Sequence, residues 1–215
     1  PITVDKSFIN DFMSHKPKVQ RKKIAKKSQI GVVNGLYATE TGLGGITLIE
    51  VMNTPTEKKK MSIEKLTGSQ GDVMKESMNV AKTLAWKLTD KKNQKSLCKE
   101  FEKTKLQGIH IHCPEGAVPK DGPSAGTAIT IAIYSLLNKK IIKKNVAITG
   151  EINLQGKVSA IGGLNLKILG GIKAGVKTFI FPEDNKKDYN KFLEKYKDKN
   201  IIFLGAVEKS QVQSF

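Results

Sequence analysis

A helix-breaking turn followed by a long apolar run constrains the fold of this chain more than any other feature. Gly122 and Pro123 interrupt regular structure immediately before Ser124. An apolar, helix-compatible run follows at residues 125–137. Ser124 is therefore expected at a helix N-terminus, where free backbone N–H groups and the helix dipole favour negative charge. Such a position suits a nucleophile whose attack creates an oxyanion.

A lysine in apolar surroundings supplies a second constraint. Lys167 lies in the glycine-rich, otherwise apolar stretch 162–169. Burial disfavours the charged form of a lysine and lowers its pKa, so that the amine becomes able to accept a proton. A serine paired with such a lysine is one way to form a hydrolytic nucleophile without histidine. Thr149, at the end of the apolar run 145–150, is a hydroxyl partner that would orient the amine.

Both residues also fit ordinary structural roles. A serine that follows Gly-Pro is most often a helix cap, and a lysine within a helix usually extends to solvent. On spacing alone, these roles are favoured over a dyad of Ser124 and Lys167. The hypothesis of a dyad therefore needs support beyond the spacing.

Strand and helix patterns alternate along most of the chain. They predict an α/β (α+β) domain with mixed β-sheets and flanking helices. The strand expected at 58–66 would close an antiparallel unit with the two strands before it, and Asp72 is expected to cap the next helix. Strands are expected at 29–38, 46–52, 58–66, 109–113, 145–150, 158–161, 178–181 and 201–204, and helices at 72–88, 125–137, 163–174 and 182–196.

The first 27 residues differ from the rest in composition. A short amphipathic piece at 8–13 is followed by the densest basic run of the chain, at 16–27. This pattern predicts the tail of a preceding domain and a linker at 1–27, with the main domain at 28–215. Because the chain begins at Pro1 rather than Met, we expect it to be part of a longer protein. No stretch approaches the roughly 20 apolar residues of a membrane span.

The net charge of +17 comes almost entirely from lysine, since Arg21 is the one arginine of the chain. Such a charge attracts nucleic acid and other polyanions. It also arises from a lysine-biased composition with solvated surfaces. We favour the second interpretation, because specific recognition of phosphates and bases relies on arginine and clustered aromatic residues.

The two cysteines, Cys98 and Cys113, do not form a Cys-x-x-Cys motif. Their number and spacing argue against a disulfide framework or a zinc site and fit a reducing compartment. A bridge between the two is left open, although it is disfavoured.

Three further polar residues lie near the serine or on a neighbouring strand. His110 and His112 share one face of an expected strand, because side chains alternate, and this placement suits metal ligands or bases. Two histidines without a third ligand make a poor metal site, so we interpret them as structural support beside the dyad. Asp121 could be the acid of a Ser-His-Asp set. Three residues before Ser124 on a turn, it is instead expected to adjust the loop or pair with a lysine.

The sequence around Ser124 resembles the serine motif of the Lon protease family. The matching residues, 119–126, read Pro-Lys-Asp-Gly-Pro-Ser-Ala-Gly, and Lys167 follows Ser124 by 43 residues, which agrees with the family's serine–lysine spacing. Residues 1–15 are similar to the end of the small ATPase subdomain that precedes the proteolytic domain in the family. Asn165 and Leu166 depart from the pattern, since many members carry a charged residue there. Further similar segments are 68–77, 110–116, 149–152, 156–158 and 161–167.

The resemblance implies a role for each residue of the site. Ser124 would be the nucleophile and Lys167 the general base, with Thr149 orienting the amine of Lys167. The backbone N–H of Ser124 would be one oxyanion donor. Because the proline before it has no N–H, the second donor would come from Gly122 or Asp121.

The resemblance further implies an ATP-dependent serine endopeptidase of protein quality control. Its substrates would be unfolded, damaged or regulatory proteins, and the full-length protein would assemble as a homo-hexamer. This domain would need no cofactor or metal, whereas ATP and Mg would bind an ATPase module outside this chain. The expected compartment is the cytoplasm or the mitochondrial matrix.

A second hypothesis is a protein without proteolytic activity. Lon-like folds also occur as ring-forming scaffolds, and the net charge of +17 would suit a scaffold that binds nucleic acid, including weak binding of DNA. A scaffold does not require the pair of Ser124 and Lys167 together with Thr149. The presence of all three leads us to favour the protease.

Overall fold

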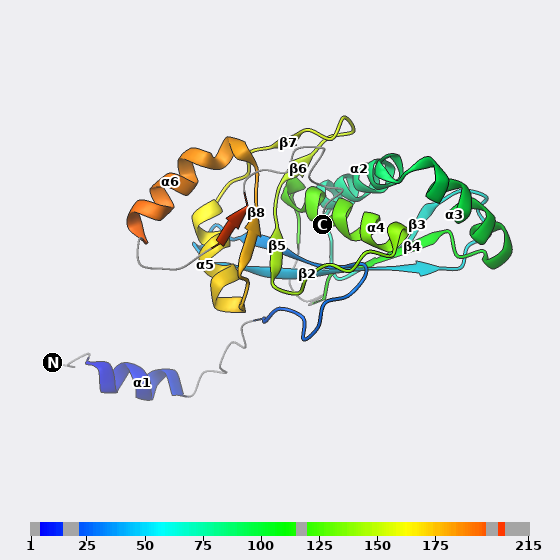
Figure 1. Ribbon diagram of the computed structural model, residues 1–215. Coiled ribbons are helices and arrows are strands. Elements are labelled where there is room, and N and C mark those ends of the chain that lie inside the picture. The colour runs from blue at the N-terminus through cyan, green and yellow to red at the C-terminus, as the bar shows by residue number, and fades with distance from the viewer. Residues whose placement is uncertain (1–4, 15–21, 115–119, 197–201, 205–215) are drawn as a thin grey trace.

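The computed structural model describes residues 5–14, 22–114, 120–196 and 202–204. Within these ranges, seven strands form one mixed sheet in the order β3-β4-β2-β1-β5-β8-β9, and two more form a small hairpin, β6-β7 (Figure 1). The strands are β1 (Val32–Ala38), β2 (Gly44–Thr54), β3 (Ser62–Thr67), β4 (Gly108–His112), β5 (Val146–Ile148), β6 (Glu151–Ile152), β7 (Val158–Ser159), β8 (Thr178–Ile180) and β9 (Ile202–Leu204). The helices are α1 (Lys6–Ser14), α2 (Asp72–Leu88), α3 (Lys91–Thr104), α4 (Gly126–Asn138), α5 (Leu164–Ala174) and α6 (Lys186–Lys195), with the 3-10 turns η1 (Pro123–Ala125) and η2 (Glu183–Asn185).

The sheet has an antiparallel half and a parallel half. Strands β4, β2 and β1 are antiparallel neighbours, whereas β5, β8 and β9 continue parallel to β1. Helix α5 connects β5 to β8 and α6 connects β8 to β9, because parallel neighbours need a long crossover. The expected α/β class, with a mixed sheet and flanking helices, is confirmed.

Strand β3 takes a different place from the one expected. The prediction that it closes an antiparallel unit is wrong, because β3 pairs in parallel with β4, and β4 separates it from β2. Ile109 and Ile111 of β4 are buried, whereas no residue of β3 is fully buried. The apolar strand therefore takes the inner position and the more polar strand the edge. Helices α2 and α3 make the long connection between the two.

Helix α4 lies at the centre of the larger of two apolar clusters. Its residues are buried on all sides of the helix, so it packs between the sheet and α2 rather than on the surface. The second cluster joins α5 and α6 to β1, β5 and β8 around Ile168 and Phe179. Figure 1 shows α2, α3, β3 and β4 gathered at one end of the sheet and α5, α6 and β8 at the other.

Two of the helices depart from expectation. The prediction that Asp72 caps α2 is wrong by one residue, because Gly71 is the N-cap and Asp72 is already helical. Helix α3 is not among the predicted elements. Only Leu97 and Phe101 of this helix are buried, so an apolar period is hard to detect among its many lysines.

The N-terminal segment is described in part. Helix α1 coincides with the amphipathic piece expected at 8–13. Ile24, within the expected linker, donates its N–H to the carbonyl of Ala174 in α5 at 3.1 Å, so the end of the basic run packs on the domain. Residues 1–4 and 15–21, residues 115–119 of the approach to the serine, and residue 201 of the last expected strand lie outside the described residues. The domain boundary at 27 and 28 stays a prediction. Among the described helices, none has both the length and the hydropathy to cross a membrane.

Helix α5 packs backbone to backbone against the start of β2. A Cβ atom on Gly170 would lie 2.1 Å from the carbonyl carbon of Gly44, and a Cβ on Gly44 would lie 1.9 Å from the carbonyl oxygen of Leu166. Only glycine allows two backbones to approach this closely. The contact fixes α5, and with it Lys167, against the sheet.

We expect Gly170→Ala to lower the free energy of unfolding by roughly 1–3 kcal/mol, because the added methyl group forces α5 away from β2. In an unconstrained helix the same change would stabilise by about 1 kcal/mol, so the sign is informative. Thermal unfolding measures the effect, with Gly162→Ala as control, since a Cβ there meets open space. A Tm for Gly170→Ala equal to or above that of the parent would contradict this packing.

Candidate active site

Ser124 lies in the 3-10 turn η1, which runs directly into α4. Gly122, two residues before Ser124, has φ of 115°, a backbone conformation that favours glycine. This conformation turns the chain into η1. Ser124 itself is half-buried. The expected position of the serine at the start of a buried helix is confirmed.

Lys167 reaches this serine from helix α5. The left-handed Gly163 starts the helix, and the backbone N–H of Lys167 donates to the carbonyl of Gly163 at 3.0 Å. The side chain is only 4% exposed. Its Nζ lies 3.1 Å from Ser124 Oγ and 3.3 Å from Thr149 Oγ1. The structure thus brings the three predicted residues together.

Thr149 follows the end of β5 and forms hydrogen bonds with both Ser124 and Lys167. Its backbone N–H donates to the carbonyl of Ile180 in β8 at 3.0 Å, which holds the residue on the sheet. Its hydroxyl donates to the carbonyl of Ser124 at 3.2 Å. Because a hydroxyl has one hydrogen, Thr149 must accept from the amine of Lys167. A neutral amine then keeps its lone pair free to face Ser124 Oγ.

Burial sets the protonation of the amine. Removal from water lowers the pKa of Lys167 to about 8 from the usual 10.5, and desolvation is the one cause of the shift. About a tenth of the amine is therefore neutral at pH 7 and about half at pH 8. A lysine that is neutral to this extent is able to take a proton from a hydroxyl.

Asp121 ties the serine loop to the start of α2. Its Oδ1 accepts from the backbone N–H of Met74 at 2.9 Å and from that of Gly122 at 2.8 Å. The Gly71 N–H donates to the carbonyl of Lys120 at 2.8 Å, which adds a backbone link between the same segments. A carboxylate from the loop thus replaces the missing side-chain cap of α2. The Gly122 N–H, one of the two expected second oxyanion donors, is engaged in this bond.

The two histidines bond to the same threonine at the end of β3. His110 Nε2 lies 2.9 Å from Thr67 Oγ1, and His112 Nδ1 lies 2.6 Å from the same oxygen. The Thr67 hydroxyl has one hydrogen, so at least one of the two rings must donate to it. Within the described residues, neither histidine bonds to Ser124 or Asp121. The described residues also hold no group of three or more His, Cys, Asp or Glu side chains placed to bind a metal. Both cysteines are free, so the bridge left open above is absent.

A model of the Lon protease (S16) C-terminal proteolytic domain matches residues 3–212. This chain belongs to the Lon protease family. The Lon protease of Clostridium acetobutylicum is 46% identical over 187 residues, which are 86% of this chain and 22% of that protein. The mitochondrial Lon protease homolog 3 of Arabidopsis thaliana is 38% identical over 210 residues, 97% of this chain and 22% of that protein. A Lon protease homolog of Acanthamoeba polyphaga mimivirus is 41% identical over 191 residues, 87% of this chain and 18% of that protein. The chain thus spans about a fifth of the length of these relatives.

In this Lon domain, one contact of the serine was not expected from the sequence. The Gly150 N–H donates to the carbonyl of Ser124 at 2.8 Å, and the Gly150 carbonyl accepts from both the N–H and the hydroxyl of Thr127. A Cβ on Gly150 would lie 2.7 Å from the Thr127 hydroxyl, so this close approach requires glycine. The only signal in the sequence is a glycine directly after Thr149.

We expect Lys167→Met to stabilise the fold at pH 7. The folded-state pKa of about 8 lies below the unfolded value, so burial of the charged amine destabilises the fold by about 3 kcal/mol below pH 8. This penalty is relieved as the pH rises from about 8 to 10.5. After the loss of two hydrogen bonds, the net gain should be about 1–3 kcal/mol at pH 7 and should shrink at higher pH. Denaturant unfolding at pH 7 and pH 10 measures it, and a difference that does not change with pH would contradict the lowered pKa.

Proposed function

We propose that Ser124 is the nucleophile and Lys167 the general base of a serine endopeptidase. The observation that carries the proposal is the 3.1 Å separation of Nζ from Oγ, combined with burial of the amine. The fold gains nothing from either feature. A buried lysine destabilises the folded state, and a serine that only caps a helix does not need a lysine beside it. Membership of the Lon protease family agrees with this chemistry.

The proposed reaction uses the neutral amine twice. Lys167 takes the Ser124 proton as Oγ attacks the peptide carbonyl, which gives a tetrahedral intermediate and then an acyl-enzyme. The resulting ammonium protonates the leaving amine. The Lys167 amine, neutral again, then activates a water molecule that hydrolyses the ester between Ser124 and the acyl group. Thr149 keeps Nζ in place through these steps by accepting one of its hydrogens.

The oxyanion would be stabilised by the loop that leads into α4. We propose the Ser124 N–H as the first donor, since it lies at the positive end of the helix. The Gly122 N–H is held by the Asp121 carboxylate, so it can serve as second donor only when that bond opens. The N–H of Asp121 is the alternative. In this proposal Asp121 acts on the loop and not as the acid of a triad, and His110 and His112 support β4 beside the site.

The partners belong to the whole protein. We propose that a longer Lon-type protease, with an ATPase module that binds ATP and Mg, delivers unfolded, damaged or regulatory proteins to this domain. Residues 1–27 would connect the two, and the assembly would be a homo-hexamer. The domain itself would need neither a cofactor nor a metal. We propose the cytoplasm or the mitochondrial matrix as its compartment, which fits the two free cysteines and the bacterial and mitochondrial relatives.

A ring-forming scaffold that binds nucleic acid is the less favoured function. The net charge of +17 supports weak binding of DNA. A scaffold has no use for an amine that is buried against a serine hydroxyl, whereas a protease requires it. Cleavage activity therefore separates the two.

Ser124→Ala and Lys167→Ala should each reduce cleavage of an unfolded fluorogenic protein by at least about 100-fold. The kcat/KM of the parent should rise through pH 8 and level off above it, because the base is the neutral amine. Lys173→Ala is the matched control, since this lysine is exposed on the same helix. Activity that persists in either dyad variant would refute the proposal.

Thr149→Val should lower the limiting kcat by about tenfold with little change in KM. The ammonium form of Lys167 loses an acceptor, so the midpoint of the pH profile should also move to lower pH. Thr149→Ser keeps the hydroxyl and should restore both. A serine variant as impaired as the valine variant would show that Thr149 acts through packing and not through its hydroxyl.

A further inference from the structure

A surface pocket of about 660 Å³ opens at the end of α2 that lies far from the serine loop. Its walls come from the segment between β2 and β3, from the C-terminal half of α2, from α3, and from the residues before β4. Figure 1 shows these elements together at one end of the sheet. The pocket is therefore separate from the site of Ser124 and Lys167.

The floor of the pocket is apolar and rigid. Met61 and Trp86 are partly exposed in it, and both pack against the core cluster that contains the buried Phe101. Side chains anchored in a core keep their shape when no ligand is bound. The floor thus presents a fixed apolar surface to an incoming side chain.

The rim of the pocket is strongly basic. The four lysines that line it are Lys59, Lys60, Lys82 and Lys105, against one carboxylate, Glu102. Within the described residues, none of these lysines takes part in an ion pair, although Lys58 pairs with Glu64 at 3.0 Å nearby. The rim is therefore free to pair with an anionic ligand.

One wall of the pocket is held in place by the protein itself. The side-chain amide of Gln107 donates to the carbonyls of Thr56, at 3.3 Å, and of Lys58. The Thr56 N–H donates to the carbonyl of Lys105 at 2.9 Å. These bonds pin the segment that carries Lys59 and Lys60, so little order must be gained on binding.

We propose that this pocket binds an acidic segment of a polypeptide. One apolar side chain of the segment would lie between Met61, Trp86 and Phe101, and its carboxylates would face the lysines of the rim. A volume of about 660 Å³ suits a ligand of a few side chains. A single partly exposed tryptophan among lysines is a poor platform for stacked bases, which favours a peptide over nucleic acid.

The position of the pocket connects it with cleavage. Trp86 lies twelve residues after Met74, whose N–H binds Asp121, and this separation along α2 is about 18 Å. Roughly five or six extended residues would span that distance. A substrate held by the pocket would thus be kept within reach of the serine loop. This consequence rests on the proposed function, whereas binding itself does not.

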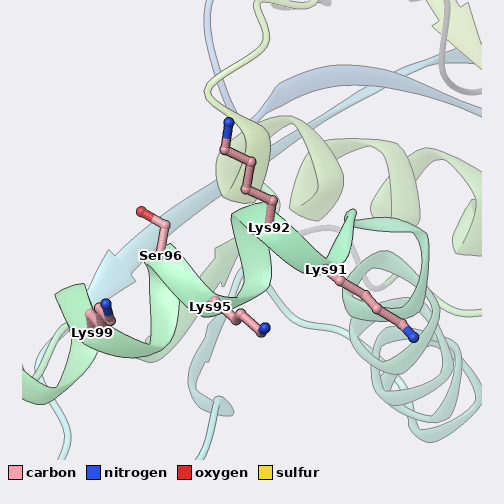
Figure 2. A pocket seen from close by; sticks show the side chains of 5 residues that line it. All are labelled: Lys91, Lys92, Lys95, Ser96 and Lys99. Carbon is pink, nitrogen blue, oxygen red and sulfur yellow. The ribbon is translucent and has the colours of Figure 1, made fainter.

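A second pocket has the basic charge of the first but lacks its apolar residues. It measures about 420 Å³ and is lined only by Lys91, Lys92, Lys95, Ser96 and Lys99 of α3. Figure 2 shows the amines of Lys92 and Lys95 pointing to different sides of the helix, with no labelled aromatic side chain among the lining residues. This surface has charge without an apolar floor or convergent amines. Its lysines therefore serve as a matched control.

The test measures binding in the Ser124→Ala protein, which cannot cleave the probe by the proposed route. Trp86 is the only tryptophan of the chain, so its fluorescence reports directly on the pocket. The probe is a short peptide of aspartate and glutamate around one leucine, and we expect a saturable change in emission. Replacement of the leucine by glycine should weaken binding at least tenfold. Bound peptide should also slow alkylation of Cys98, which lines the pocket, while Cys113 is buried.

Paired charge variants distinguish the pocket from the general charge of the surface. Lys59→Gln with Lys82→Gln should weaken binding at least tenfold, whereas Lys95→Gln with Lys99→Gln removes the same charge and should change it less than threefold. Equal weakening by the two pairs would overturn the proposal. So would an unchanged Trp86 signal, or an oligonucleotide of equal charge that binds more tightly at the same salt concentration. Because no cleavage is measured, failure of the Ser124–Lys167 proposal would leave this result interpretable.

Discussion

Exclusion of water from one amine is the constraint on which this site depends. The Lys167 side chain is 4% exposed, and burial alone lowers its pKa to about 8. In water the same amine would be an ammonium with nothing to accept a proton. Two hydroxyls, of Ser124 and Thr149, are the hydrogen-bond partners of the buried amine, and that of Ser124 is the proposed nucleophile.

The three residues come from three segments of the fold, and packing or hydrogen bonds hold each segment in place. Ser124 precedes α4, which is buried on all sides, and its carbonyl is held by Thr149 and Gly150 at the end of β5. Lys167 comes from α5, whose glycine contact with β2 sets its distance from the sheet. The loop before the serine is tied to α2 by Asp121. Packed backbones thus hold the three side chains in one arrangement, as the proposed attack by the hydroxyl requires.

Local patterns were enough to predict parts of this arrangement. The Gly-Pro break and the apolar run placed Ser124 correctly, and the strand before Thr149 was expected. The pairing of Ser124 with Lys167 could not follow from spacing, because residues 43 apart meet only through the sheet. The residue types raised the hypothesis of a dyad, and the family resemblance supported it. Strand β3 lies at the edge because the more apolar β4 takes the inner position in the sheet. This outcome depends on comparing two strands, so the sequence of β3 alone could not predict it. The bond of Asp121 to α2, like helix α3 with its two buried residues, depends on contacts between distant segments.

The most direct measurement is the titration of the Lys167 amine by NMR, in protein labelled with ¹³C and ¹⁵N at lysine. Lys167→Met identifies the signal of this amine by its loss. The account predicts a midpoint near pH 8 for Lys167, well below the usual 10.5 of a lysine amine. A midpoint near 10.5 would mean that the amine is charged at working pH. In that case Lys167 could not be the base that activates Ser124.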